Sequence, residues 1–427
     1  MSASTAGHEP PHERTPGWED VVVHRLRERA SWPALTAAVL LYTLSSVRAY
    51  AKDRTGIDNA VVVRAAHTLL EGGSPYADKR FLYLPGAVFA ALPQTPLPRR
   101  VLFYAVPPVT GALVALGVML ALRIFDVRAD SRLAVAALVG TALFVPFQSL
   151  VFLGNWTAAS VVALPAALLL ARRGRWSGAG MVIGAAVALK PMLVPVLLLF
   201  VLARRWRALG WAVGLPAALS LAAAWAMPRP GLFFTRTLPF LLHGQDSYAR
   251  PYDSAWPSVL PRLGVPHTLA LVLAVAAGAT VLSFARLRWR AGGEEALRLV
   301  ECAALLMLAA FVVSRPAFLN YALVVVPSLA ASVVERGAAA RSVWFWMPLV
   351  PQVGGVPWPG LDTAQRHAFR DAVMYGGLAA VLALAARRRA GRRAGRSGAK
   401  EPGKGLVTLR NGDYSLCREV EPGATPE

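Results

Sequence analysis

Long apolar runs constrain this chain more than any other feature. Uninterrupted stretches such as Val101 to Ala121 and His267 to Phe284 approach the roughly 20 helical residues needed to cross a bilayer. Hydrophobic residues make up 56% of the 427 positions, charged residues only 16%, and the mean hydropathy is +0.46. A water-soluble protein of this length would need more polar surface. We therefore predict an all-α polytopic membrane protein.

The charge distribution argues against a nucleic-acid-binding protein. The formal net charge is +21, but the arginines gather in short clusters between apolar runs, as expected for cytoplasmic loops. Cys302 lies in an apolar run and Cys417 in the C-terminal tail, and neither has a partner at a spacing that predicts a disulfide or a zinc site. Residues 1–29 are polar and contain no signal-peptide apolar region. No metal or other cofactor is expected.

The basic clusters predict which side of the membrane each loop occupies. Arg25, Arg27 and Arg29 precede the first span, and five arginines follow the last one, so both termini are expected in the cytoplasm. This gives a cytoplasmic segment at 1–30, a transmembrane domain at 31–387 with outer loops at about 48–100 and 228–263, and a disordered basic tail at 388–427. About 10 full spans are expected. They lie near residues 32–47, 101–121, 133–153, 157–170, 209–227, 267–284, 299–313, 320–334, 343–356 and 372–386.

The stretch Met181 to Leu202 does not fit a single span. Arginine clusters flank it on both sides, and Lys190-Pro191 and Pro195 interrupt it. Proline removes a helix hydrogen bond and disfavours helix in the preceding residue. We predict two short helices that meet near Lys190 and return to the same side, an arrangement tolerated in membranes where it lines a cavity.

The first outer loop contains a helix with an acid near its start. Apolar residues recur with helical spacing between Asp58 and Leu70, which predicts an amphipathic helix at the membrane interface. Asp58 could serve that helix as a cap, because carboxylates are favourable at helix N-termini. It could equally act as a catalytic group. The sequence pattern leaves both interpretations open.

Lys190 is the most unusual charged residue in the apolar part of the chain. A lysine within a span costs about 2.5–3.5 kcal/mol on insertion scales, so it normally faces a cavity, a partner or an anion. A phosphate group would satisfy it. Snorkelling, or pairing with an outer-loop acid such as Asp58, is the alternative.

These features resemble glycosyltransferase family 87, whose members are membrane enzymes of the GT-C class that use polyprenyl-phosphate sugars. The resemblance rests on three stretches within 58–321. They are Leu189-Lys190-Pro191 followed by Arg205-Trp206-Arg207; Asp58 followed by Gly73, Pro75-Tyr76 and Tyr83-Leu84-Pro85; and Phe233-Phe234-Thr235-Arg236-Thr237. The implied fold is a GT-C-like bundle with long outer loops 1 and 4.

The resemblance also implies roles for particular residues. Asp58 would be the general base of an inverting transfer of a pentose or hexose, of the arabinofuranose or mannose class, to an envelope glycan or glycolipid at the outer face of a bacterial plasma membrane. The donor phosphate would be held by Lys190, Arg236, Arg250 and Arg315. Sugar or acceptor contacts are expected from Tyr76, Tyr83, Asn155, Asp246, Asn320 and Tyr321.

The chain departs from the family pattern at several positions, and two other functions are compatible with it. The usual Tyr-Pro-Pro is Tyr83-Leu84-Pro85, a neighbouring acid pair is reduced to Asp58-Asn59, and the late Ser-Pro-x-x-Trp-x-His motif reads Ser314 to Tyr321 without its tryptophan and histidine. The alternatives are a transporter or flippase, and a non-catalytic partner in envelope assembly. Transporters usually carry embedded acids and repeated halves, which this sequence lacks.

Overall fold

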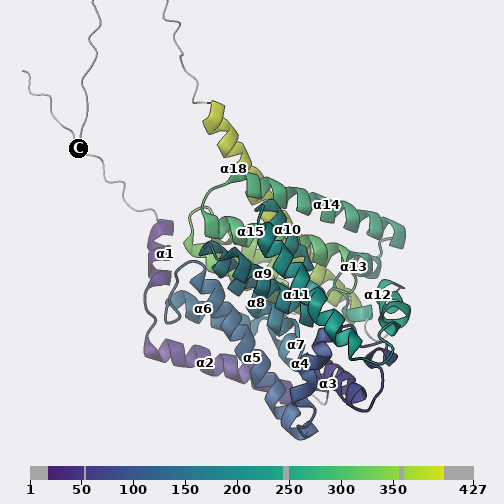
Figure 1. The fold of residues 1–427 in the computed structure, drawn as a ribbon. Coiled ribbons are helices and arrows are strands. Elements are labelled where there is room, and N and C mark those ends of the chain that lie inside the picture. Colours follow the sequence, from purple (N-terminus) through teal and green to yellow (C-terminus); the bar gives the residue numbers. More distant parts are fainter. Residues whose placement is uncertain (1–17, 52–53, 244–249, 355–359, 399–427) are drawn as a thin grey trace, which may run out of the picture.

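The computed structural model describes residues 18–51, 54–243, 250–354 and 360–398, and these residues form helices joined by short turns (Figure 1). No strand lies within the described ranges, which contain only isolated β-bridges. The predicted all-α class is confirmed. The α-helices are α1 (Trp18–Arg27), α2 (Trp32–Val47), α3 (Ile57–Leu70), α4 (Pro85–Ala91), α5 (Arg99–Arg123), α6 (Arg132–Leu143), α7 (Val145–Leu153), α8 (Thr157–Arg172), α9 (Trp176–Leu189), α10 (Leu197–Leu202), α11 (Trp206–Trp225), α12 (Leu238–His243), α13 (Trp256–Arg262), α14 (His267–Ala291), α15 (Glu295–Val313), α16 (Ala322–Ala331), α17 (Val343–Trp346) and α18 (Thr363–Gly398).

Six of the described helices are long and apolar enough to cross a membrane. They begin at Trp32, Arg99, Trp206, His267, Glu295 and Thr363. Large apolar side chains on their outer faces are exposed in the isolated chain, among them Leu221, Trp225 and Val272. Such faces fit a lipid surround, because water would disfavour them. The chain is a multi-pass membrane protein.

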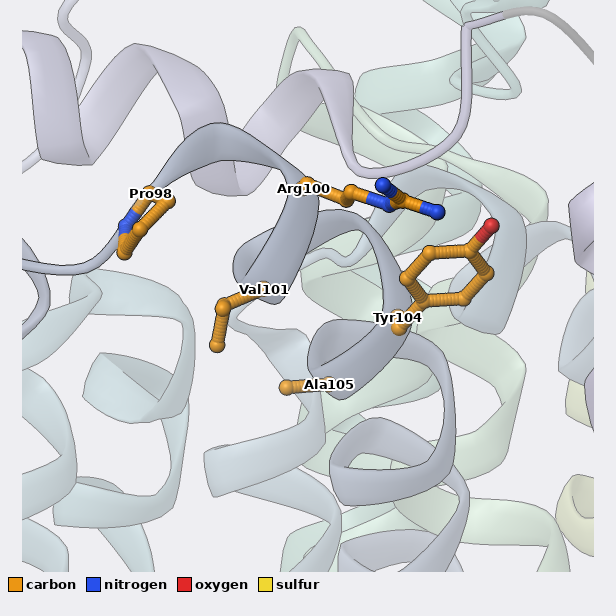
Figure 2. Close-up of a pocket in the computed structure, with 5 residues that line it drawn as sticks. All are labelled: Pro98, Arg100, Val101, Tyr104 and Ala105. Atoms are coloured by element: carbon orange, nitrogen blue, oxygen red, sulfur yellow. The ribbon is translucent and has the colours of Figure 1, made fainter.

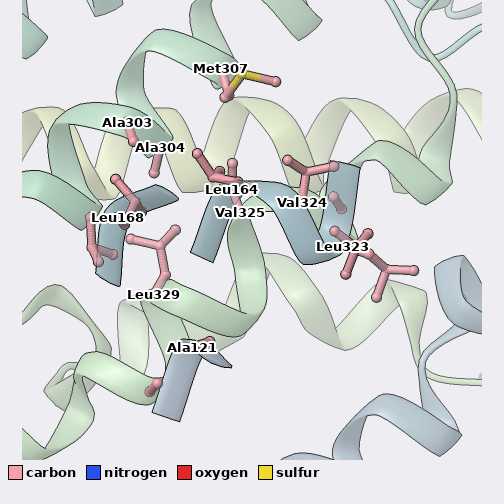
Figure 3. Close-up of a cluster of buried hydrophobic side chains, with 14 of the residues drawn as sticks. Ala121, Leu164, Leu168, Ala303, Ala304, Met307, Leu323, Val324, Val325 and Leu329 are labelled. Carbon is pink, nitrogen blue, oxygen red and sulfur yellow. The ribbon is translucent and has the colours of Figure 1, made fainter. Parts of the chain in front are cut away.

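The centre of the bundle is packed with small and branched aliphatic residues. Figure 3 shows Leu164 and Leu168 of α8 between side chains of α15 and α16, with Ala121 of α5 nearby. Small residues let helix backbones approach closely, and branched ones fill the remaining space. α15 is the most enclosed of the long helices, which makes it the central element.

Some predicted spans are shorter or broken in the structure. The run 133–153 divides into α6 and α7 at Phe144, just before Pro146. The run expected near 343–356 is only the one-turn helix α17, followed by a 3-10 segment at Met347–Gln352. Pro348 and Pro351 remove backbone donors that a continuous α-helix would need, so a longer helix does not form there.

The predicted break at Lys190 is confirmed. α9 ends at Leu189, Lys190 has extended backbone angles, and a 3-10 segment (Pro191–Val196) leads into α10. Phe200 of α10 contacts Trp176 at the start of α9, with ring centroids 6.4 Å apart, and Arg205 lies over the same ring. The chain therefore returns to the level at which α9 began, as a hairpin with Lys190 at its tip.

α11 then runs parallel to α9 at very close range. A Cβ atom at Gly180 would lie 2.2 Å from the Ala208 carbonyl oxygen, and one at Gly184 would lie 2.7 Å from that of Trp211. Only glycine permits this approach. The two glycines thus fix the hairpin against the following long helix.

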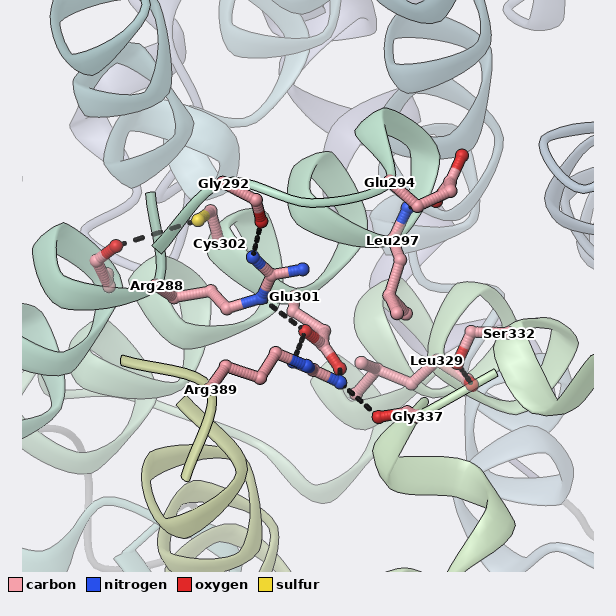
Figure 4. Close-up of polar contacts among 11 residues, drawn as sticks. Arg288, Gly292, Glu294, Leu297, Glu301, Cys302, Leu329, Ser332, Gly337 and Arg389 are labelled. Atoms are coloured by element: carbon pink, nitrogen blue, oxygen red, sulfur yellow. Dashed lines mark hydrogen bonds and ion pairs between the residues drawn. The ribbon is translucent and has the colours of Figure 1, made fainter. Parts of the chain in front are cut away.

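A buried charge cluster ties together the end of the bundle opposite Lys190 (Figure 4). Arg288 of α14 donates to Glu301 of α15 at 2.6 Å and to the Gly292 carbonyl at 2.8 Å. Arg389 of α18 donates to the same carboxylate at 3.0 Å and to the Gly337 carbonyl. Arg288 and Glu301 are only 1% and 2% exposed, so this cluster is a structural clamp between three helices.

α18 is longer than the apolar run that predicts it. It continues to Gly398, into the segment that the sequence assigns to the tail. Arginine and alanine are good helix formers, which accounts for the extension beyond Ala386. Residues 399–427 lie outside the described part of the chain.

Candidate active site

Two glycine-containing turns bring Asp58 to the bundle. Gly56 precedes α3 with φ +79°, and its N–H donates to the Phe152 carbonyl at 2.8 Å. Gly154 ends α7 with φ +60°, and a Cβ atom there would lie 3.2 Å from the Gly56 Cα and 2.5 Å from the Val106 side chain. Positive φ and close backbone contact both require glycine. The start of α3 is thereby set against the turn that carries Asn155.

Asp58 is not the cap of its helix. The N-cap position belongs to Gly56, and no side-chain cap bond is formed there. Asp58 instead accepts a hydrogen bond at 2.5 Å from the Asn155 amide through its Oδ2 atom. Its Oδ1 atom has no hydrogen-bond partner among the described residues. One carboxylate oxygen is therefore held in place while the other is available.

Asn155 connects Asp58 to Lys190. While its nitrogen donates to Asp58, its Oδ1 accepts from the Lys190 ammonium at 2.9 Å and from the Thr157 backbone N–H at 2.9 Å. Lys190 also donates to the Thr157 hydroxyl at 2.8 Å. These bonds fix the orientation of the amide, since both donors must face its oxygen. The acid and the lysine are brought together through one buried side chain.

Neighbouring residues reinforce this arrangement. Asn59 accepts from the Trp156 indole N–H at 2.9 Å and donates to Gln94 at 2.9 Å. Asp58-Asn59 is therefore paired residue by residue with Asn155-Trp156. Both the oxygen and the nitrogen of the Asn59 amide thus bond within the protein, and an amide cannot supply the negative charge of the missing second acid.

The charges at the site are only partly balanced. Burial raises the pKa of the Asp58 carboxyl, whereas the hydrogen bond from Asn155 and the charge of Lys190 act to lower it. Lys190 makes no direct ion pair within the described residues, because its hydrogen-bond acceptors there are neutral oxygens. A positive charge held only by neutral groups is suited to binding an anion.

Two tyrosines enclose Lys190. Its ammonium nitrogen lies 5.8 Å from the Tyr83 ring centroid and 4.9 Å from that of Tyr321. Both phenols also lie within electrostatic range of Asp58. Cation–π contacts of this kind orient an ammonium group without neutralising it.

Asn320 lies beside Tyr321 and is 1% exposed. Neither atom of its amide has a hydrogen-bond partner in the described structure. Buried amides are almost always bonded, so such a group points to a ligand contact. The sugar-binding role predicted for Asn320 needs such an unpaired amide.

The remaining predicted residues lie elsewhere. Tyr76 is fully buried and donates to the Tyr83 carbonyl at 3.1 Å, which supports Tyr83 from behind. Arg236 is exposed and donates to the Ala77 carbonyl at 3.2 Å. A file of packed aromatic rings, running from Phe233 through Tyr76 and Phe81 to Tyr83, separates it from Lys190.

Arg315 contacts the Asp253 carboxylate, with a nitrogen–oxygen distance of 3.5 Å. Tyr321 lies within electrostatic range of Asp253 as well as Asp58, which places Arg315 near the site but not at Lys190. Asp246 lies outside the described residues, and so does the side chain of Arg250. The phosphate- and sugar-binding roles of these residues stay predictions.

The structure adds Thr157, Trp156 and Asn59 to the site. The signal for Trp156 and Thr157 in the sequence is the stretch Gly154-Asn155-Trp156-Thr157, which separates two apolar runs on the same predicted side as Asp58; Asn59 directly follows Asp58. A glycine followed by polar residues at that place marks a turn facing the outer loop.

Two surface hollows of the described chain lie away from this site. One, of about 620 Å³, lies at the start of α5, where Arg100 and Tyr104 project side by side (Figure 2). Another follows the exposed face of α11 around Trp211. Neither is lined by Asp58 or Lys190. The chemistry of the buried polar groups, not the hollows, identifies the candidate active site.

Comparison with known proteins identifies the family of the chain. The profile of glycosyltransferase family 87 matches residues 81–316, more than half of the chain. The chain belongs to glycosyltransferase family 87, and this membership classes it among the glycosyltransferases. The matched region contains Asn155 and Lys190, whereas Asp58 precedes it.

Two curated relatives are more specific. Both are named alpha-(1->3)-arabinofuranosyltransferase, from the CDC 1551 / Oshkosh and H37Rv strains of Mycobacterium tuberculosis. Each is 29% identical over 226 residues, covering 51% of this chain and 52% of the relative. The chain thus spans about half the length of the curated relatives it matches. No solved structure matches it.

Proposed function

We propose that this protein transfers a pentose or hexose, of the arabinofuranose or mannose class, from a polyprenyl-phosphate donor to an envelope glycan or glycolipid. The reaction takes place at the outer face of the bacterial plasma membrane, with both termini in the cytoplasm. The observation that carries the proposal is the bridge Asp58–Asn155–Lys190. It presents a carboxylate and a cation side by side, as a transfer from a sugar phosphate requires.

Asp58 acts as the general base. As the acceptor hydroxyl oxygen bonds to the anomeric carbon, the bond from that carbon to the donor phosphate oxygen breaks. The hydroxyl proton passes to the Asp58 carboxylate, and the polyprenyl phosphate leaves with the bonding electrons. Burial raises the pKa of Asp58, which strengthens it as a base. A single base without a nucleophilic carboxylate beside it favours inversion at the anomeric carbon.

Lys190 binds the departing phosphate. Its contacts with Asn155, Thr157 and the two tyrosine rings hold the ammonium in place before substrate arrives. A preorganised charge stabilises the negative charge that grows on the phosphate oxygen as the sugar leaves. Arg315, near Tyr321, and Arg250 are further candidates for this phosphate; Arg236 would contact it only from the far side of the aromatic file.

The sugar and acceptor would contact Tyr83, Tyr321 and the unpaired amide of Asn320. The relatives' printed name supports arabinofuranose as the transferred sugar. Loss of the tryptophan and histidine from the 314–321 stretch supports a different acceptor or sugar. The two possibilities separate in one experiment.

That experiment incubates the purified protein in detergent with a panel of polyprenyl-phosphate sugars and saccharide acceptors. We expect a glycosylated product from one donor, and its loss in Asp58→Asn. Glu71→Gln, which changes an exposed acid just after the last residue of the same helix, is the matched control and should retain full activity. Uptake of a lipid-linked or free solute into proteoliposomes without any product would instead favour a transporter. An unchanged cellular phenotype in Asp58→Asn would favour a non-catalytic partner.

A further inference from the structure

A second group of cations lies near Asp253 and Asp371. Arg262 of α13 and Arg366 and Arg370 of α18 all lie within electrostatic range of His367 of α18, whose ring meets the edge of the Tyr252 ring at a centroid distance of 5.9 Å. Arg262 donates to the Asp253 backbone carbonyl. We call Arg262, Arg366 and Arg370 the arginine cluster.

The acids near the arginine cluster are already committed. Asp253 accepts from the backbone N–H groups of Ala255 and Ala317, each at 3.0 Å, and from the Ser258 hydroxyl at 2.6 Å. Asp371 accepts from Ser254 at 2.6 Å and from Gln352 at 2.9 Å. Both carboxylates are 3% exposed. They hold the loops together. The Arg262 guanidinium donates to the backbone carbonyls of Ser258, Pro251 and Asp253, and neither acid forms an ion pair with Arg366 or Arg370 within the described residues.

A third acid, Asp362, is exposed and caps the first turn of α18 through the Gln365 N–H at 2.7 Å. Within the described part of the chain it forms no ion pair with Arg366. The arginine cluster therefore keeps an excess of positive charge.

Arg366 and Arg370 have the fewest hydrogen-bond partners in the arginine cluster. They stand four residues apart on α18, so both project from one face, and like charges at this spacing repel. The Nε atom of each is enclosed without a hydrogen-bond partner in the described structure. Arg366 donates one bond, at 3.3 Å, to the Leu361 carbonyl, and Arg370 donates none to the described residues. An anion with several oxygens would accept hydrogen bonds from both guanidinium groups at once.

We propose that the arginine cluster is a second phosphate-binding site, separate from Lys190, for the phosphate or diphosphate of a lipid at the Asp58 end of the bundle. It lies where α14 and α18 begin and α15 ends, so a bound headgroup would rest at the membrane surface. The lipid is either a lipid-linked substrate or an anionic phospholipid. The proposal concerns binding alone and does not depend on chemistry at Asp58.

The test measures binding of three probes to the purified full-length protein in neutral detergent: farnesyl diphosphate, inorganic pyrophosphate and phosphatidylglycerol. Saturable binding of farnesyl diphosphate or pyrophosphate, with little of phosphatidylglycerol, indicates a lipid-linked substrate. Preference for phosphatidylglycerol indicates a structural phospholipid. In either case the double variant Arg366→Gln/Arg370→Gln should weaken binding by about tenfold or more, because two charge-assisted hydrogen-bonding groups are lost.

Three controls make the result decisive. Arg100→Gln removes an exposed arginine elsewhere on the chain and should leave the affinity unchanged. Arg366→Lys/Arg370→Lys keeps both positive charges but loses the paired N–H donors of the guanidinium groups, so this variant should bind the probe with intermediate affinity. Without phosphate, the glutamine double variant should unfold at the same temperature as the wild type or higher, because a repulsion is removed. Unchanged affinity in the double variant, or loss of binding only in Lys190→Gln, would overturn the proposal.

Discussion

Asn155 is the residue on which the geometry of the site depends. Its single amide faces the Asp58 carboxylate with the nitrogen and the Lys190 ammonium with the oxygen. An aspartate at this position could not donate to Asp58, and an alanine would connect neither group. Asn155 is therefore best understood as a positioning residue, although the sequence suggests it only as a sugar contact.

Removing Asn155 should change the pH dependence of the reaction. A base must be ionised, so activity falls as the pH drops through the pKa of Asp58, which burial holds above its ordinary value of about 3.9. The bond from Asn155 lowers that pKa, so Asn155→Ala should raise it further and move the acid limb of kcat/KM to higher pH. Rates measured across the pH range check this. An acid limb at the wild-type position would show that Asn155 does not act on Asp58.

Single residues were only partly predictable from the sequence. Asp58 and Lys190 stand out because each is a charge in an unexpected place. Their connection through Asn155 depends on two turns about 100 residues apart in the chain, and no local pattern reveals that contact. The available Asp58 oxygen and the unpaired amide of Asn320 likewise become visible only in three dimensions.

At the scale of elements, the close approach of Gly56 and Gly154 sets α3 against the bundle. Gly154→Ala would place a side chain at φ +60° and 2.5 Å from Val106. The left-handed conformation alone costs about 1–2 kcal/mol. We expect lower stability together with a larger loss of kcat, because the turn also carries Asn155.

Thermal unfolding and turnover of the same samples check this prediction. Gly140→Ala is the control, since Gly140 lies inside α6 with nothing within 4 Å of the added Cβ. It should be neutral or stabilising by about 0.5–1 kcal/mol. Equal effects of the two substitutions would contradict the special role of the Gly154 turn.

The hairpin at Lys190 depends on the contact between α9 and α11. Gly180→Ala would push a Cβ atom to within 2.2 Å of the Ala208 carbonyl oxygen, which is backbone and cannot rotate away. Overpacking of this kind costs about 1–3 kcal/mol. Gly178→Ala, whose Cβ would meet only the Leu170 side chain at 3.7 Å, is the matched control on the same helix. Unfolding midpoints of the two variants should differ; equal midpoints would show that α9 and α11 can separate freely.

Prolines set the helix boundaries in two parts of the chain. Lys190-Pro191 predicts the break in the hairpin because proline has a local and unavoidable effect. Pro348 and Pro351 act in the same way, so the apolar run that predicts a span at 343–356 contains only short helical turns. Apolar composition shows burial or lipid contact, but not helix length.

At the scale of the whole molecule, the two ends of the bundle have different tasks. One end holds Asp58, Lys190 and the arginine cluster, whereas the other is closed by Arg288, Glu301 and Arg389. Glu301→Gln would leave Arg288 buried without a counter-charge, which costs about 3–5 kcal/mol. We expect a large fall in the unfolding midpoint in detergent.

Two further variants identify the cause of the lower unfolding midpoint. Glu295→Gln changes an exposed acid of the same helix and should have little effect. Replacing both partners, in Arg288→Leu/Glu301→Leu, should recover part of the stability, because the fully buried Arg288 charge is removed and only the partly exposed Arg389 loses its counter-charge. A Glu301→Gln protein as stable as the wild type would contradict the clamp.

The central claim is that Asp58 takes the acceptor proton at a site where Lys190 holds the donor phosphate. The most direct test is a single-turnover reaction of purified wild type and Asp58→Asn with the active polyprenyl-phosphate sugar, measuring donor binding and product formation in the same samples. The account predicts that Asp58→Asn binds the donor with similar affinity but forms product about 10²–10⁴ times more slowly. Product formation by Asp58→Asn at the wild-type rate would contradict it.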